Sequence, residues 1–330
     1  MIRSFVFNNG KLNNGKLVGQ DLDVDSLKLV MFDKGLHVWI DLENSSDAEA
    51  RPVLEGVCNF HPLAIEDCIQ PSDRPKVDEY ENCLFMVIHA VDFTRSTEEF
   101  RTTELNIFMG KDFLVTYHNN PLRSITAAID RVQKNSVAVA KAPDRLAHTI
   151  LDLLIENYQP VMEELSAEIE ELEQKVLSAK SRNILTEVLK VRNEVQKLRQ
   201  IIAPQREVIA RFSRGEFSMV RAHLLPYYRD LYDHLMRISD AVETFRDSLT
   251  NVLQVHLNLQ QTQVNQVIKV LTVMATLAMP IFLITSFYGM NFGHFPRDMS
   301  PPELAYAWVF GLTAVTTGLL YWFIKRKGWF

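Results

Sequence analysis

The sequence has few of the residues and motifs on which enzymes and disulfide-bonded or zinc-stabilised domains depend. Three cysteines occur in 330 residues and no Cys-x-x-Cys pair is present, which argues against a disulfide framework and against a structural zinc site. The HExxH, GxSxG and GxGxxG motifs and a Walker P-loop are missing, and the nine histidines are scattered. The sequence therefore predicts a protein that is not an enzyme and that holds no cofactor.

An excess of basic residues is missing as well. The chain has 35 Lys and Arg against 41 Asp and Glu, which gives a net charge of −6 at pH 7. A nucleic-acid partner is not expected, because a phosphate-binding face needs a basic excess. The N-terminal stretch MIRSFVFNNGK turns polar after seven residues, whereas a secretory signal needs a longer apolar segment.

Charged residues are absent from two long stretches near the C-terminus. These are VLTVMATLAMPIFLITSFY, 19 residues at 270–288, and LAYAWVFGLTAVTTGLLYWFI, 21 residues at 304–324. A helix that crosses a bilayer needs about 20 such residues. We predict one transmembrane helix at about 267–288 and a second at 304–324. The alternative is two buried helices of a soluble protein, which seldom run so long without a charge.

The basic residues around these stretches predict their orientation. Lys269 comes just before the first stretch, and the basic segment 325–330 follows the second. The linker 289–303 holds one Arg, one Asp and one Glu. By the positive-inside rule, both termini are expected in the cytoplasm and the linker is expected to be an outer loop. This describes a multi-pass membrane protein, and we expect it in a bacterial or archaeal inner membrane.

The N-terminal third has a different pattern. The stretch LHVWIDL at 36–42 alternates like a half-buried strand, and HPLAIEDC at 61–68 suits a short helix. Two apolar stretches, 83–93 and 104–118, are typical of buried strands, the second interrupted by a Gly-Lys-Asp turn. We expect a cytoplasmic α/β domain with a central sheet over residues 1–122.

Residues 123–218 are predicted to be helical, with two neighbouring helices of opposite charge. Residues 152–173 contain eight acids and no base, whereas residues 190–214 contain seven bases and two acids. Two interpretations remain open: an antiparallel pair, or two solvated faces.

A single long helix is predicted over residues 219–288. After Pro226 this stretch has no Gly or Pro until it enters the first apolar run. A continuous helix of more than sixty residues would be roughly 90–100 Å long. Such a helix needs packing along most of its length, and a bundle of copies from several subunits would supply it.

One face of the first apolar run alternates polar and apolar side chains. Two interpretations are open: ordinary helix packing, in which Ser and Thr are common, and the wall of a pore with polar and apolar rings. Read at steps of three or four, the face contains Asn265, Ile268, Thr272, Thr276, Met279, Leu283 and Ser286.

The stretch YGMNF at 288–292, directly after the first apolar run, resembles the signature of the CorA family of magnesium and cobalt transport proteins, which are divalent-cation channels. Its position before a short loop, a second apolar run and a basic C-terminus also matches that family. Further stretches are similar, so the resemblance covers about residues 55–330: HPLAIEDC, RPKVDEYENCLFMVIHAV, ENYQPVMEELSAEIEELE, YYRDLYDH, VETFRDSL and PPEL.

The resemblance implies an α+β membrane protein that forms a homopentamer. In it, a long helical stalk from each subunit forms a cytoplasmic funnel, and the first of two C-terminal transmembrane helices lines the pore. The implied function is uptake of Mg2+, and also Co2+, driven by the membrane potential and gated by cytoplasmic Mg2+. The implied partners are copies of the chain, the lipid bilayer and these cations.

The resemblance also implies roles for particular residues. Gly289, Met290 and Asn291 would form the selectivity site, where a ring of Asn291 carboxamides holds the hydrated ion at the outer mouth. Asp230 would belong to a regulatory metal site, and Glu303 to the outer loop. Together with the face described above, the implied pore-lining residues are Asn265, Ile268, Leu271, Thr272, Thr276 and Met279, with Leu271 as an apolar constriction.

Some positions depart from the family pattern and leave the preferred ion open. Ile268 stands where relatives commonly have Met, and Phe282 stands where some have Thr. The outer loop is longer than usual and contains His294. One alternative is therefore a ZntB-like transporter of Zn2+, Co2+ or Ni2+ that couples to protons. The other is a membrane-anchored enzyme, for which the sequence offers no catalytic motif.

Overall fold

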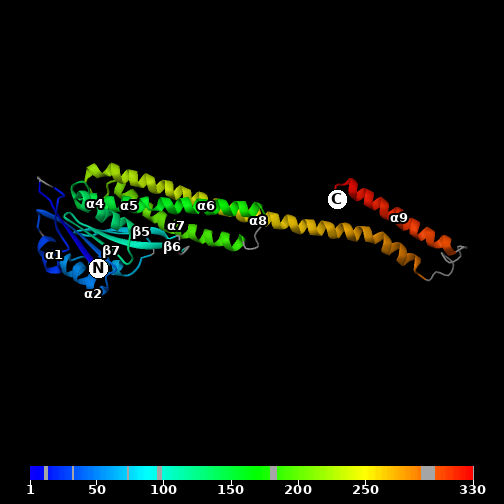
Figure 1. Ribbon diagram of the computed structural model, residues 1–330, viewed down its shortest axis with the longest axis horizontal. Helices are drawn as coiled ribbons and strands as arrows, with labels where there is room; N and C mark the ends of the chain where they lie inside the picture. The colour runs from blue at the N-terminus through cyan, green and yellow to red at the C-terminus, as the bar shows by residue number, and fades with distance from the viewer. Residues whose placement is uncertain are drawn as a thin grey trace. The chain divides into compact units, whose positions relative to one another are not determined.

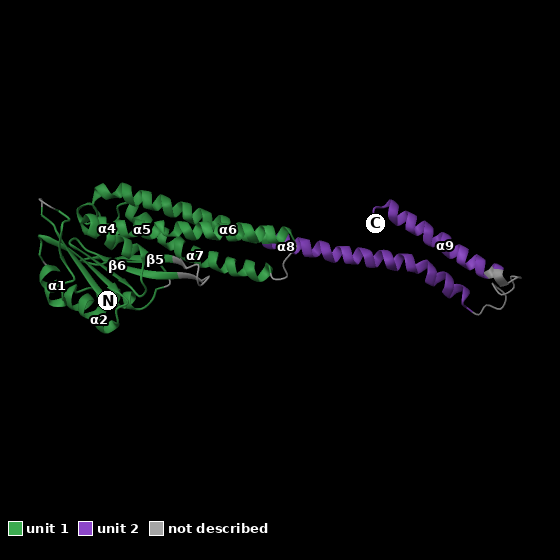
Figure 2. Ribbon diagram, in the orientation of Figure 1, with its two compact units in different colours: residues 1–252 green, residues 253–330 purple. Residues whose placement is uncertain are grey.

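The computed structural model describes residues 1–10, 14–31, 33–72, 74–94, 99–178, 184–290 and 302–329. The chain divides into two compact units, residues 1–252 and residues 253–330 (Figure 2). The first holds the sheet and most of the helices, and the described residues of the second form mainly the C-terminal part of one long helix and a further helix.

In the described part of the first unit the strands form one seven-stranded sheet at its centre, in the order β2-β1-β3-β7-β6-β5-β4. Only β3 and β7 pair in parallel; the other neighbours are antiparallel. The predicted central sheet is confirmed, including the turn between β6 and β7. The strands are β1 (Ile2–Asn8), β2 (Leu17–Gln20), β3 (Leu36–Glu43), β4 (Lys76–Glu79), β5 (Leu84–Thr94), β6 (Glu99–Met109) and β7 (Phe113–His118).

Strand β3 is buried on both faces, so the prediction of a half-buried strand was wrong. Its six inner residues are all buried, including the polar His37 and Asp41. The alternating pattern does not mark an exposed face here, because both polar side chains have partners within the fold: the His37 Nε2 lies 2.6 Å from the Ala140 carbonyl, and Asp41 lies 2.8 Å from Arg3. Helices cover both faces of the sheet, as Figure 1 shows.

The helices on one face belong to the segment between β1 and β4. They are α1 (Val24–Met31), α2 (Asp47–Arg51), a π-helix (Pro52–Val57) and α3 (Pro62–Ile69). The short helix predicted at 61–68 is confirmed. Its start is well defined, because the His61 Nδ1 accepts a hydrogen bond from the Leu63 N–H at 3.3 Å and Pro62 occupies the first turn. This face packs into a core that includes Ile40, Leu54, Ile65 and Phe108.

The opposite face is covered by α4 (Arg123–Val139) and α5 (Pro143–Glu156), after which α6 (Tyr158–Leu177) and α7 (Ile184–Ser213) run side by side (Figure 1). Of the two interpretations left open, the structure favours the antiparallel pair, because α6 and α7 are in contact and Lys175 near the end of α6 lies 3.0 Å from Glu187 near the start of α7. Exposed ion pairs contribute little to stability. The contact is made mainly by buried apolar stripes, which include Val161, Leu165, Ile169 and Leu172 on α6 and Val188, Val191, Val195 and Leu198 on α7.

Two buried polar side chains join this helical pair to the sheet. At the edge of β5, both backbone polar groups of His89 have side-chain partners. The His89 N–H donates to the Gln205 Oε1 at 3.1 Å, and the His89 carbonyl accepts from the Tyr158 hydroxyl at 2.7 Å. Burial raises the pKa of Tyr158, so its hydroxyl stays protonated and remains a donor. At His89 the edge of β5 is therefore covered by the helical pair.

Helix α8 (Leu225–Tyr288) is one continuous helix of 64 residues that begins in the first unit and continues into the second. The predicted long helix is confirmed, although it starts at Leu225 rather than near residue 219. A 3-10 turn (Ala222–Leu224) precedes it. Within the first unit α8 packs against α7, because Arg199 lies 2.5 Å from Glu243 and Arg206 bonds Ser239 at 3.4 Å.

The second unit contains the rest of α8 and α9 (Pro302–Arg326). Both helices are long and apolar enough to cross a membrane, and only 6% of each apolar segment is buried within the chain. The two predicted membrane-spanning segments therefore correspond to two helices whose apolar surfaces remain uncovered by the single chain.

Candidate functional site

The start of α8 is fixed to α5 by a buried carboxylate. Asp144, 4% exposed, accepts hydrogen bonds from the Arg221 side chain at 2.6 and 2.8 Å and from the Arg221 backbone N–H at 3.1 Å. The buried Tyr228 hydroxyl donates to the Asp144 carbonyl at 3.2 Å, and the His148 ring meets the Tyr228 ring edge-on. The first turns of α8 therefore have a defined position on the helical layer of the first unit.

We expect the Asp144–Arg221 pair to be strongly coupled. In a double-mutant cycle of Asp144→Ala and Arg221→Ala, the interaction should amount to about 1.5–3 kcal/mol, the range for hydrogen bonds to charged groups. The interaction energy is measured by hydrogen exchange, which reports the free energy of opening at the amides of residues 225–235 in the full-length protein. Arg214→Ala serves as a control, because Arg214 pairs with Glu216 at the exposed surface. Loss of protection in Asp144→Ala no greater than in this control would contradict the anchoring role.

The predicted pore-lining residues lie along α8 in the second unit. Ile268, Leu271 and Met279 are 54%, 66% and 63% exposed within the chain, so their side chains are available to partners or lipid. Thr276 is half-buried and lies at the edge of the contact with α9, beside the buried Val273. Helical spacing places Asn265, Ile268, Thr272, Thr276 and Met279 on one stripe, next to which Leu271 lies.

The polar members of this stripe keep acceptor capacity free. The hydroxyls of Thr272 and Thr276 donate to backbone carbonyls one turn earlier at 2.8 and 2.7 Å. Their remaining lone pairs can still accept from the water shell of a cation. The Gln261 amide donates to the Asn265 Oδ1 at 3.1 Å, which orients that carboxamide. The stripe therefore offers neutral oxygen acceptors between apolar side chains.

Helix α8 ends at Tyr288, immediately before the Gly-Met-Asn signature. The Gly289 N–H still bonds the Thr285 carbonyl at 2.9 Å, and a Cβ at Gly289 would lie 3.0 Å from that oxygen, tighter than ordinary packing. Met290 is 56% exposed within the chain. Asn291 lies outside the described residues. Its role in the selectivity site therefore stays a prediction, as do those of Gly289 and Met290.

The other end of the predicted outer loop is close to the end of α8. Glu303 lies in the first turn of α9. The Trp308 Nε1 of α9 donates to the Tyr288 hydroxyl at 3.3 Å. This contact holds the last turn of α8 near the start of α9, so the two ends of the loop are brought together.

Asp230, predicted to serve in a regulatory metal site, lies on the exposed face of α8. Its side chain is 72% exposed, and its carboxylate is 3.8 Å from the His234 Nε2, one turn further on. His234 also lines a groove of about 760 Å³ between α8 and the helices α5 and α6. Asp230 is thus accessible within the single chain, and its regulatory role stays a prediction.

Sequence reasoning missed a cluster of potential metal ligands at one end of β3 and β7. Ligand atoms of Asp41, Glu43 and His118 all lie within 4.8 Å of one another. However, the Arg3 guanidinium lies 2.8 Å from Asp41 and also bonds Glu43, so a positive charge is already in place. The Thr116 hydroxyl donates to the Asp41 Oδ1 at 2.6 Å. Because these partners satisfy the acids, we interpret the cluster as a structural network.

The ionisation of Asp41 agrees with this interpretation. Burial opposes the charged carboxylate, but hydrogen bonds from His118 and Thr116 and the nearby Arg3 outweigh burial and lower the pKa of Asp41. The sequence signal for this network is an aspartate, Asp41, among mainly apolar residues of a strand.

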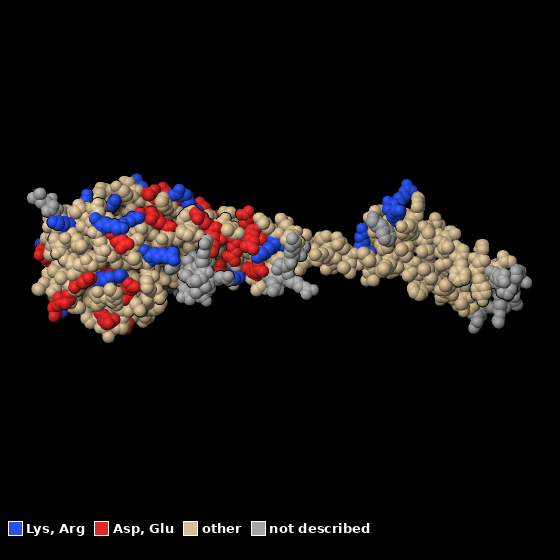
Figure 3. Space-filling model, viewed as in Figure 1, with Lys and Arg blue, Asp and Glu red and all other residues tan. Residues whose placement is uncertain are grey.

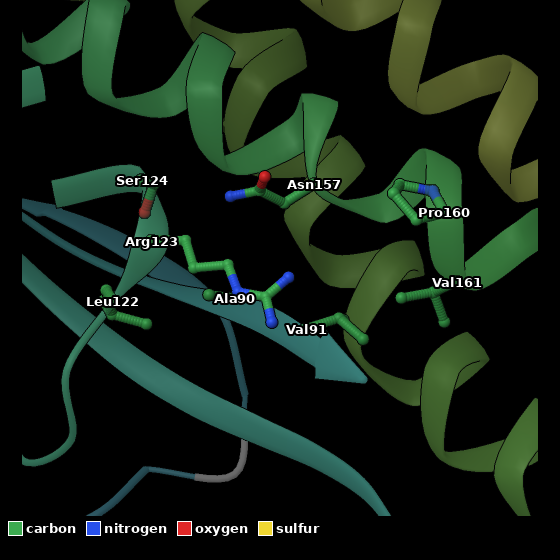
Figure 4. Close-up of a pocket in the computed structure, with 8 residues that line it drawn as sticks. All are labelled: Ala90, Val91, Leu122, Arg123, Ser124, Asn157, Pro160 and Val161. Carbon is green, nitrogen blue, oxygen red and sulfur yellow. The ribbon is translucent and has the colours of Figure 1, made fainter. Parts of the chain in front are cut away.

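A small cavity of about 40 Å³ lies where β5, the start of α4 and the junction of α5 and α6 meet (Figure 4). Ser124, 1% exposed, lies at this cavity, and its hydroxyl has no hydrogen-bond partner among the described residues. The volume is enough for one or a few water molecules, which would satisfy the hydroxyl. We assign no ligand to this cavity.

Comparisons with known proteins agree with the sequence resemblance. The family model described as "CorA-like Mg2+ transporter protein" matches residues 35–326. A protein of Bacillus subtilis named as a candidate metal ion transporter, YfjQ, is 31% identical over 88% of this chain and 89% of its own. The cobalt/magnesium transport protein CorA of Thermotoga maritima is 28% identical over 93% of this chain and 87% of its own.

Solved structures share the fold. The complete CorA magnesium transporter of Methanocaldococcus jannaschii aligns over 99% of this chain and 98% of its own, with a TM-score of 0.81 and 22% identity. The cytoplasmic domain of ZntB from Vibrio parahaemolyticus aligns over 68% of this chain and 88% of its own, with a TM-score of 0.57 and 13% identity. At these identities the alignments concern the fold alone.

Proposed function

The chain belongs to the CorA-like Mg2+ transporter family, and we propose that it is a homopentameric channel for the uptake of Mg2+, and also of Co2+. The observation that carries the proposal is the position of the Gly-Met-Asn signature. It begins at Gly289, directly after a helix that runs for 64 residues and ends in an apolar segment, and a second apolar helix follows. A transporter of this family needs no catalytic centre.

The selectivity step follows from the chemistry of Mg2+. This ion is small and gives up its water reluctantly, so a channel does well to hold it hydrated. Five Asn291 carboxamides at the outer mouth would offer neutral oxygens to the water shell. A neutral acceptor favours entry of the ion without retaining it too strongly, and conduction requires both. Gly289, at the helix end, would let the chain turn towards this position, and Met290 would pack the loop.

The proposed pentamer would cover the surface that the single chain leaves exposed. Apolar side chains of α8 in the second unit are widely accessible, for example Val267 at 68% and Met274 at 66%. A helix in a membrane can cover such a surface with lipid or with a second helix. Packing of α8 from five copies would line a central conduit with the stripe of Asn265, Thr272 and Met279, and Leu271 would supply a constriction that closes by dewetting.

The driving force requires no nucleotide hydrolysis. An inside-negative potential contributes about 2.3 kcal/mol per charge per 100 mV, so about 4.6 kcal/mol for a divalent ion. With both termini in the cytoplasm, as the basic residues at 325–327 predict, the Asn291 ring would face the outside and the ion would move inward down this potential.

A ZntB-like transporter of Zn2+, Co2+ or Ni2+ is the second candidate. The long outer loop with His294 favours it, because imidazole suits these softer ions. Liposomes that contain the purified protein, tested with Mg2+ and Zn2+ in competition and with or without a pH gradient, distinguish the two. Mg2+ entry that depends on potential and ignores the pH gradient supports the CorA-type channel. Zn2+ entry that requires the gradient supports the second candidate.

For regulation, we expect Asp230→Lys to remove inhibition by internal Mg2+. The exposed carboxylate would otherwise bind the ion between subunits, and a lysine reverses its charge. The measurement is channel current against internal Mg2+ concentration. Asp240→Lys, the same change at another exposed aspartate of α8, is the control. Currents in Asp230→Lys that still fall with internal Mg2+, as in the control, would reject the regulatory role.

A further inference from the structure

The second unit contains an apolar groove between α8 and α9, close to the basic end of α9. Its volume is about 510 Å³. Thr272 and Thr276 belong to the predicted pore-lining stripe and only border the groove, whereas Val273, which is not part of that stripe, lies against the α9 side. The lining residues are Thr272, Val273 and Thr276 of α8, and Leu320, Phe323, Ile324, Lys327 and Trp329 of α9 and the residues after it.

Positive charge gathers at one end of this groove. Lys327 is part of the lining, and the Lys269 ammonium donates to the Gly328 carbonyl at 3.5 Å, which places it at the same end. Lys269 is the only charged residue between Asp247 and Arg297. Figure 3 shows Lys and Arg atoms near the C-terminal end of α9, whereas the rest of the visible described surface of this unit is uncharged.

We propose that this groove binds an anionic glycerophospholipid of the surrounding leaflet. One acyl chain would lie against Val273, Leu320 and Phe323, and the phosphate would lie between Lys269 and Lys327. Basic pockets between membrane helices, at the level of the headgroups, are suited to such lipids. Trp329, at the same end, has the amphipathic ring that favours this interface.

Charge favours a lipid over a second copy of the chain. In a ring of identical subunits that cross the membrane in one direction, every basic end lies at the same face. A neighbouring helix in the groove would therefore bring further Lys and Arg beside Lys269 and Lys327. An anionic headgroup instead neutralises them, and a zwitterionic lipid would add an ammonium group of its own. The inference concerns lipid binding and does not depend on which ion the protein transports.

The test uses native mass spectrometry of the full-length protein in detergent, with phosphatidylglycerol and phosphatidylcholine of identical acyl chains. We expect phosphatidylglycerol to bind at least about tenfold more tightly. Lys269→Gln and Lys327→Gln should each weaken it by about fivefold, as expected for one basic residue near an anionic headgroup. Lys325→Gln removes the same charge outside the groove lining and should change binding by less than about twofold. Equal binding of both lipids, or equal loss in Lys325→Gln, would overturn the proposal.

A photo-crosslinking amino acid in place of Leu320 identifies the occupant in membranes without relying on the lysine variants. An adduct with the mass of a phospholipid is the expected product. A covalent dimer of two chains as the main product would mean that a neighbouring copy fills the groove, and would overturn the proposal. Because the readout is the mass of the adduct, loss of ion transport in the same protein leaves the result interpretable.

Discussion

Replacing Asn291 with alanine is expected to lower Mg2+ uptake by at least about 60-fold. Each carboxamide in the proposed ring contributes a hydrogen bond to the hydrated ion, worth about 0.5–1.5 kcal/mol. Removal of all five at once is therefore worth about 2.5 kcal/mol or more, and every 1.4 kcal/mol is a factor of ten. The rate of Mg2+ entry into liposomes under an inside-negative potential measures the effect, and the size of the detergent-solubilised complex should not change.

Two further substitutions at the same position distinguish the binding of the ion from the rate of its transport. Asn291→Asp keeps an oxygen acceptor but places five negative charges in the ring, so we expect tighter binding of the ion and slower release. Asn291→Gln keeps the carboxamide but moves it by one methylene, so uptake should fall less than in Asn291→Ala. Wild-type uptake in Asn291→Ala would show that the selectivity site lies elsewhere, whatever the ion.

Replacing Asp41 with alanine should have the largest effect on the stability of the first unit. Asp41 is fully buried, and its loss leaves the buried His118 and the partly buried Arg3 without their shared carboxylate. Breaking a buried ion pair from one side costs about 3–5 kcal/mol. Hydrogen exchange at the amides of β3 and β7 in the full-length protein reports the local free energy of opening.

Glu43→Ala is the matched control for this network. Glu43 shares Arg3 with Asp41 but is partly exposed, so its loss should cost clearly less. Addition of Mg2+ or Zn2+ should not increase the protection of β3 and β7, because Arg3 already supplies the positive charge. A metal-dependent gain of protection that disappears in Asp41→Ala would instead identify the cluster as a metal site.

The same network gives a pH dependence with a defined sign. The pKa of Asp41 is lowered in the folded protein, whereas an unfolded aspartate has a pKa of about 3.9. The ionised carboxylate therefore stabilises the fold above about pH 4, and this contribution is lost as the pH falls through the folded value. In Asp41→Asn, the protection of β3 and β7 should lose this part of its acid dependence. An unchanged acid profile would mean that other carboxylates account for it.

Much of the architecture could be predicted from periodicity and composition. The long helix followed from a stretch without Gly or Pro after Pro226, and the membrane segments followed from two runs without charge. For strand β3, the alternation of polar and apolar residues predicts one solvent-exposed face, and this prediction was wrong. Its polar residues are buried against partners far away in the sequence, such as Ala140 and Arg3. The short edge strands β2 and β4, of four residues each, are too brief to show a pattern.

The candidate site could be predicted only in part. Helical spacing assigns Asn265, Thr272 and Met279 to one stripe, but it cannot say which side of that stripe meets α9. The position of Thr276 at the edge of that contact therefore required the structure. Likewise, Asp144 and Arg221 are 77 residues apart, and no local pattern links them. The resemblance identified Asn291, but the described range 184–290 ends one position before this residue.

The most direct measurement of the central claim is a structure of the protein in a lipid nanodisc, determined by single-particle electron microscopy with Mg2+ present. The account predicts five copies around one axis, α8 from each copy next to that axis, and the Asn291 side chains around density for a hydrated cation. A monomer, or an axis lined by α9 with Asn291 turned away, would contradict it.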